Sequence, residues 1–107
     1  MSYSVRLTDT AKQDLREIAF WIAEQAKDTA IAKRFVEELR DECKKLETFP
    51  SGGAIPKDRV LKSMGYRFTV HKDYLIFYLT NESEKQVDIM AIFNAKRDYM
   101  RVMRKFI

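Results

Sequence analysis

Two periods of apolar residues divide the chain into helices and strands. Across residues 11–26, and again across residues 31–46, apolar side chains recur at three- and four-residue steps, which is the spacing of one helix face. Phe20 and Trp21 widen the first stripe. Because only a few residues separate the two stripes, they predict an antiparallel helix hairpin. Residues 3–7 alternate between apolar and polar positions and predict a short strand ahead of it.

The second half of the chain follows the two-residue period of strands. Residues 64–71 place aromatic or apolar side chains on one face and Arg67 and His71 on the other. Residues 74–79 are apolar without interruption, so we expect a central strand that is covered on both faces. After a polar turn, residues 87–93 predict a further strand.

The order of these elements indicates the fold class. A basic helix is expected to open in the run 94–99, and residues 50–61, which hold both prolines, are expected to be irregular. The resulting order βααβββα predicts an α+β fold, with an N-terminal strand, an antiparallel helix hairpin packed on a small, mostly antiparallel sheet, and a C-terminal helix. Without a linker or an internal repeat, residues 1–107 are expected to form a single domain.

Composition narrows the class of protein. Apolar residues make up 46% of the 107 positions, which suits a globular domain and excludes disorder. No apolar run approaches the roughly 20 residues that span a bilayer, and the first residues lack the features of a signal peptide. The single cysteine, Cys43, falls on the apolar stripe of the second helix. We therefore expect a cytoplasmic protein with no membrane partner.

Positive charge is concentrated in the second half of the chain. The net charge is +4, yet residues 1–50 hold nine Lys and Arg against ten Asp and Glu, whereas residues 51–107 hold eleven against six. Such an excess either keeps a small protein soluble or marks a contact surface for nucleic acid or an acidic protein.

Several kinds of active site do not fit this sequence. One histidine and one cysteine are too few for a zinc site, no glycine-rich segment has the spacing of a phosphate loop, and no serine lies in a nucleophile elbow. We expect neither a metal nor another cofactor. What remains is a basic patch on the sheet and the start of the last helix, for which the candidate target-binding residues are Lys57, Arg59, Arg67, His71, Lys96, Arg97 and Arg101.

Part of this patch has residue types that metal-free RNA cleavage needs. That reaction requires proton transfer and fixed positive charge around the phosphorane, and Arg67 and Arg97 are candidates for the charge. Tyr99 or His71 are candidates for the proton transfer. His71 and Tyr99 each also have a simpler interpretation. His71 lies next to a turn, where an exposed residue without a role in the site is expected, and Tyr99 is as readily explained by packing on the sheet.

Short patterns in a fixed order extend over nearly the whole chain. They are Ala11-x-x-Asp14-Leu15-x-x-Ile18, Leu46-x-x-Phe49-Pro50-x-Gly52, Tyr66-Arg67, Tyr74-Leu75-Ile76-Phe77-Tyr78, Val87-x-Ile89-x-x-Ile92 and Lys96-Arg97-Asp98-Tyr99. In this order and spacing the sequence resembles the RelE/ParE superfamily of toxins from type II toxin–antitoxin (plasmid stabilization) modules. The resemblance implies a helix hairpin packed on a small antiparallel sheet, in agreement with the fold predicted from the residues.

The resemblance implies two possible targets. RelE-like members cut mRNA on the ribosome with basic strand residues and an Arg and Tyr near the last helix, which points to Arg67, Arg97 and Tyr99 as catalytic residues in that case. ParE-like members inhibit DNA gyrase. This chain departs from the nuclease pattern at Leu75, where a catalytic arginine is expected, and at Asn94, where a related nuclease group has histidine. Loss of a strand arginine removes charge stabilisation, which favours the ParE-like branch.

Three hypotheses follow from this resemblance. The first is a growth-inhibiting, non-enzymatic toxin that binds and poisons DNA gyrase, and the second is a ribosome-dependent mRNA endonuclease. The third is a family member that only binds its antitoxin. In each case we expect a cognate small acidic antitoxin whose amphipathic segment lies along the sheet and helix hairpin and covers the basic corner.

Overall fold

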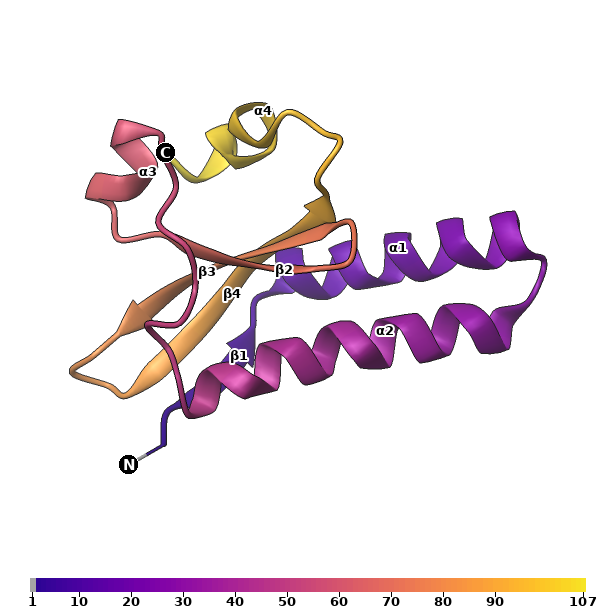
Figure 1. Cartoon of the computed structure of the whole chain (residues 1–107), viewed down its shortest axis with the longest axis horizontal. Helices are drawn as coiled ribbons and strands as arrows, with labels where there is room; N and C mark the ends of the chain where they lie inside the picture. The colour runs from indigo at the N-terminus through magenta and orange to yellow at the C-terminus, as the bar shows by residue number, and fades with distance from the viewer. Residues whose placement is uncertain (1) are drawn as a thin grey trace.

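A four-stranded sheet forms the middle layer of the structure, and helices cover both of its faces (Figure 1). In the computed structural model, which describes residues 2–107, the strands are β1 (Ser4–Leu7), β2 (Arg67–His71), β3 (Tyr74–Asn81) and β4 (Gln86–Asn94). Their order across the sheet is β1-β4-β3-β2. Only β1 runs parallel to its neighbour, so the predicted mostly antiparallel sheet is confirmed.

The helices follow the predicted order, with one addition. They are α1 (Asp9–Ala26), α2 (Thr29–Lys44) with the 3-10 turn η1 (Lys45–Glu47), α3 (Arg59–Ser63), and α4 (Tyr99–Met103) with the 3-10 turn η2 (Arg104–Phe106). Each α-helix begins behind a side chain that accepts a hydrogen bond from the amide of its first turn; these capping residues are Thr8, Asp28, Asp58 and Asp98. None of the described helices is long and apolar enough to cross a bilayer.

Strand β3 supplies alternate side chains to two separate cores. Tyr74, Ile76 and Tyr78 face the helix hairpin and pack with residues of α1 and α2, whereas Phe77 faces α3 and α4. The pairing register with β4 shifts between Phe77 and Tyr78, which leaves Met90 as an extra residue in β4. The central position and two-sided burial predicted for this strand are therefore confirmed.

Aromatic rings hold the second core together. The Phe77 ring lies parallel to Phe93 at 5.6 Å and 7°, and it also stacks on Tyr99 at 5.9 Å and 18°. Phe68 of β2 approaches the same ring at 5.2 Å. Offset aromatic pairs of this kind stabilise beyond the area they bury. Tyr99 thus packs on the sheet, as one of its two sequence interpretations predicted.

The helix hairpin is longer than the sheet that it covers, and this corrects part of the predicted core. Both helices extend past the strands (Figure 1). Phe20 and Trp21, which the sequence placed in the apolar stripe, are 68% and 56% exposed, and Ile31 is 43% exposed. The apolar stripe of α1 is buried only at Ala11, Leu15 and Ile18, where the sheet lies beneath it.

The connection predicted to be irregular contains α3. The Asp58 carboxylate accepts hydrogen bonds from Val60 N and Leu61 N and so starts a short helix, and the Leu61 side chain is fully buried. Gly65 ends it at a φ of 88°, a left-handed conformation suited to glycine. Strand β2 consequently begins at Arg67 and not at residue 64.

The segment before α3 is fixed to the sheet by Tyr78. Its hydroxyl donates to the Pro50 carbonyl at 2.7 Å and accepts from Gly53 N at 2.9 Å, while Ala54 forms a bridge to Phe68. A Cβ atom on Gly53 would lie 2.8 Å from the Phe68 carbonyl oxygen and would collide with the Tyr78 hydroxyl. Only glycine therefore lets the chain approach the sheet this closely.

We expect Gly53→Ala to lower the free energy of unfolding by about 1–3 kcal/mol, because the added methyl group displaces either the segment or the Tyr78 ring. Urea denaturation followed by circular dichroism measures the change. Ser51→Ala, at an exposed position of the same segment, serves as the control and should stay within about 0.5 kcal/mol of the unmodified protein. Equal midpoints for the two variants would contradict this account.

Candidate target-binding surface

Arg67 lies on the face of the sheet that the helix hairpin covers. It pairs across β2 and β3 with Tyr78, and residues directly opposite one another share a face. Its Nη1 donates to the Gly53 carbonyl at 3.0 Å, so part of the guanidinium is used to fix the loop. Tyr99 stacks on Phe77, on the opposite face. The structure therefore does not bring Arg67 and Tyr99 together.

Arg97 is remote from Arg67 along the strands as well. Arg97 follows Asn94, the last residue of β4. Asn94 pairs with Tyr74 of β3, and Tyr74 pairs with His71 at the end of β2 that is far from Arg67. Four residues of strand separate that end from Arg67, a distance of about 13 Å, and two inter-strand spacings add to it. The expectation that Arg67 and Arg97 converge in one patch is therefore wrong.

His71 is held by the helix hairpin and is not an exposed bystander. Its Nε2 lies 2.9 Å from Glu38 Oε1, and its Nδ1 lies 3.5 Å from Glu42 Oε1, both on α2. Lys72 Nζ approaches the same Glu38 oxygen at 3.1 Å. The hydrogen bond from His71, with a second one from Lys72, lowers the pKa of the Glu38 carboxyl. His71 thus ties the β2–β3 turn to α2 and is removed from the basic patch.

The cations around α4 face carboxylates of α1 across two cavities. Arg97 and Arg101 line a polar cavity of about 490 Å³, to which α1 contributes Asp9, Asp14 and Glu17. Lys96 and Arg97 line a second cavity, of about 450 Å³, whose further lining residues are Asp14, Glu17, Ile18, Trp21, Tyr74, Ile92, Phe93 and Asn94. These three predicted residues do lie together, at the border between α1 and the start of α4.

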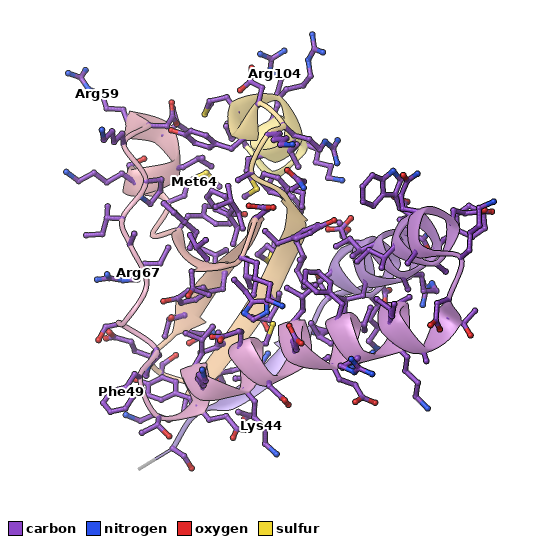
Figure 2. All side chains as sticks on the ribbon, turned by 45° about the vertical axis from the view of Figure 1, so that its right-hand side comes forward. Lys44, Phe49, Arg59, Met64, Arg67 and Arg104 are labelled. Carbon is purple, nitrogen blue, oxygen red and sulfur yellow. The ribbon has the colours of Figure 1, made fainter. Side chains whose placement is uncertain are left out.

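Lys57 and Arg59 belong to the end of the molecule formed by α3 and α4. Lys57 lines a cavity of about 310 Å³ together with Leu75, Phe77 and Tyr99, so this residue borders an apolar floor. Arg59 is exposed at the start of α3. Figure 2 shows Arg59 and Arg104 projecting from this end, opposite Lys44. The predicted patch is thus several separate cationic positions on the surface, and it is not one converging site.

Two residues of this border were not identified as site residues from the sequence. Asp14 is half-buried and its Oδ2 accepts from Ile92 N at 2.9 Å, at the point where β1 no longer pairs with β4. Burial raises the pKa of the Asp14 carboxyl, and the hydrogen bond from Ile92 together with Lys105 opposes that shift. Trp21 lines the adjoining cavity. The signal for Asp14 is its spacing: it lies four residues before Ile18 on the buried side of the helix.

We expect Asp14→Asn and Asp14→Ala to differ in their effect on stability. The asparagine oxygen still accepts from Ile92 N but never ionises, whereas alanine leaves that amide without a partner, at a cost of about 1–3 kcal/mol. A raised pKa means that the folded protein retains the proton to higher pH than the unfolded chain does. Ionisation of Asp14 therefore lowers stability as pH rises from 3.8 through the folded pKa.

Urea denaturation at pH 4 and pH 7 measures this difference. Asp14→Asn should gain stability relative to the unmodified protein between pH 4 and pH 7, and Asp14→Ala should be less stable than Asp14→Asn at both. Asp41→Asn, at an exposed position of α2, is the matched control. Indistinguishable pH profiles for Asp14→Asn and the unmodified protein would rule out a cost of ionising Asp14.

Two solved structures of toxin–antitoxin systems contain a chain with a similar fold. The chain is similar to one in the RelBE2 toxin–antitoxin complex of Mycobacterium tuberculosis, with a TM-score of 0.67 and 20% identity over 88% of this chain and 99% of that one. It is also similar to a chain of the chromosomal ParDE system of P. aeruginosa, with a TM-score of 0.72 and 19% identity over 87% and 96%. At these identities the likeness shows the fold.

The comparison with curated protein sequences gives no match. The model of one protein family, described as the ParE toxin of the parDE type II toxin–antitoxin system, matches residues 5–99. That match extends from β1 to the first residue of α4 and so includes the sheet and the helix hairpin. The chain therefore belongs to the ParE family of toxins from type II toxin–antitoxin systems.

Proposed function

We propose that this toxin arrests growth by binding and inhibiting DNA gyrase, and that it does not cut RNA. The observation that carries the proposal is the apolar floor of the cavity beside Tyr99. Leu75 lines it at the position where the nuclease branch is expected to have a catalytic arginine, and Phe77 lies next to it. Among the residues that line this cavity, Lys57 is the only cation.

RNA cleavage without a metal needs more charge than this cavity supplies. A phosphorane is stabilised by several donors that converge on its oxygens, and one flexible lysine beside aromatic rings is a poor substitute for them. Arg67, the strand arginine that the sequence offered, faces the helix hairpin and donates to the Gly53 carbonyl. The geometry therefore supports binding as the basis of toxicity.

The cations near α4 are suited to contact with a large target. Arg97 and Arg101 are exposed, and no ion pair within 4 Å engages either of them in residues 2–107. Exposed charges of this kind set the rate and orientation of association with an oppositely charged surface. We assign to this border, with Lys96, the contact with gyrase.

The double variant Arg97→Glu/Arg101→Glu should weaken inhibition of gyrase supercoiling by about tenfold or more, since two charge reversals repel an acidic target surface. Titration of the purified toxin in a supercoiling assay measures this. Lys44→Glu reverses an exposed cation at the opposite end of the molecule and should leave inhibition unchanged (Figure 2).

A second assay separates the competing functions. Incubation of the toxin with translating ribosomes and mRNA should give no toxin-dependent cleavage. Cleavage that is lost in Tyr99→Phe would establish the nuclease function instead, because that substitution keeps the stacking on Phe77 and removes only the hydroxyl. Growth without arrest when the toxin is expressed alone would indicate a family member that only binds its antitoxin.

An acidic antitoxin fits the cavity between α1 and the end of β4. Trp21, Ile18 and Ile92 give it an apolar surface. Lys96 and Arg97 supply positive charge to its lining, to which α1 also contributes Asp14 and Glu17. An amphipathic acidic segment would bury apolar side chains against Trp21 and place carboxylates beside the two cations. The similar structures named above are a toxin–antitoxin complex and a ParDE system, which supports such a partner for this chain.

Trp21 is the sole tryptophan, so its fluorescence should report antitoxin binding directly. Trp21→Ala should weaken binding of the antitoxin by about 30-fold, the size typical of a central aromatic contact. Isothermal titration calorimetry with the antitoxin encoded beside the toxin measures it. Phe49→Ala removes an aromatic side chain that is 70% exposed elsewhere and is the control. An unchanged Trp21 emission on complex formation would place the antitoxin on another surface.

A further inference from the structure

The helix hairpin carries a second groove, on which the proposed function does not depend. The groove has a volume of about 480 Å³ and is lined only by residues of α1 and α2, so no strand takes part in it. Its floor consists of small apolar residues, among them Ala19, Ala23 and Ala32. The Phe20 side chain stands beside this floor and is 68% exposed.

This groove lies on another side of α1 from the cavity assigned to the antitoxin. That cavity is lined by Asp14, Ile18 and Trp21, and the two cavities have no lining residue in common. At 100° per residue, Ala19 and Ala23 project from α1 in a direction well separated from that of Asp14 and Trp21. A segment confined to the first cavity leaves the second groove uncovered.

The charges along the groove point to its occupant. Lys33, Glu37 and Arg40 follow one another at its α2 edge, and no ion pair within 4 Å engages them in the described chain. A basic partner would be opposed by Lys33 and Arg40, and an acidic one would meet Glu37 between those two cations. A surface that carries a positive and a negative charge one helical turn apart is complementary to itself. If a two-fold axis passes between Lys33 and Glu37, Lys33 of each copy lies opposite Glu37 of the other.

The apolar residues of the groove are also complementary to a second copy of themselves. A two-fold arrangement lets each exposed Phe20 enter the alanine-lined groove of the other copy, so one surface supplies both the projection and the hollow. Small residues between helices permit close approach of a second helix pair. We propose that α1 and α2 form the interface of a homodimer, in which two hairpins pack as four helices.

Sedimentation equilibrium of the full chain tests this interface. The unmodified protein should dimerise reversibly, and Phe20→Glu should weaken dimerisation at least about 30-fold, as expected for loss of a central aromatic contact. Phe49→Glu changes an equally exposed aromatic residue outside the groove and should leave dimerisation unchanged. A chain that is monomeric at all concentrations, or equal effects of the two variants, overturns the proposal.

Two charge reversals give a sharper test that does not depend on Phe20. Lys33→Glu alone sets two glutamates against each other across the axis, and Glu37→Lys alone sets two lysines, so each variant should be monomeric. An equimolar mixture restores both opposite-charge contacts and should form a heterodimer. A mixture that associates no better than its components overturns the two-fold arrangement. Weakened antitoxin binding by Phe20→Glu, with an unmodified chain that stays monomeric, would assign the groove to the antitoxin and likewise overturn the proposal.

Discussion

The structure depends on one constraint, which is that β3 must be buried on both faces. Its neighbours β4 and β2 satisfy its backbone, while its side chains alternate between a core under the helix hairpin and a core under α3 and α4. The alternation of side chains along β3 therefore decides on which face of the sheet each residue paired with it lies. Because Arg67 is opposite Tyr78, it belongs to the hairpin side, and because Tyr99 stacks on Phe77, it belongs to the other. The same constraint that builds the fold keeps the two apart.

The sequence predicted most of this architecture because periodicity records burial directly. The uninterrupted apolar run at residues 74–79 correctly indicated a central strand, and the two helical stripes indicated the hairpin. Periodicity does not record how far a helix extends beyond its sheet, so Phe20 and Trp21 were assigned to a core that ends before them. The helix α3 was missed because prolines and glycines dominate its connection, although Asp58 was a visible capping signal.

The candidate site could be predicted only as a set of residue types. The predicted residues Lys96, Arg97 and Arg101 are neighbours in the chain and line two adjoining cavities, of which Arg97 lines both. The sequence failed for Arg67 and His71, whose partners come from distant segments: the Gly53 carbonyl for one and the carboxylates of Glu38 and Glu42 for the other. Long-range hydrogen bonds of this kind leave no local pattern, so a basic residue on a strand looks the same whether it binds a target or a loop.

The distribution of charge separates the surfaces by the kind of partner they accept. Carboxylates of α1 line both cavities together with the cations near α4, so an acidic chain is attracted there only where it contacts Lys96 and Arg97 and stays clear of Asp14 and Glu17. Positive and negative side chains alternate along the α2 edge of the groove between α1 and α2. This pattern disfavours a partner that carries charge of one sign only, but it does not disfavour a second copy of the chain. Both surfaces include residues of α1 beyond Ile18, so a hairpin shortened to the length of the sheet would lose part of each. Ile18 is the last buried residue of α1, so the turns of the helix beyond it add mainly exposed surface, which the proposed contacts would use.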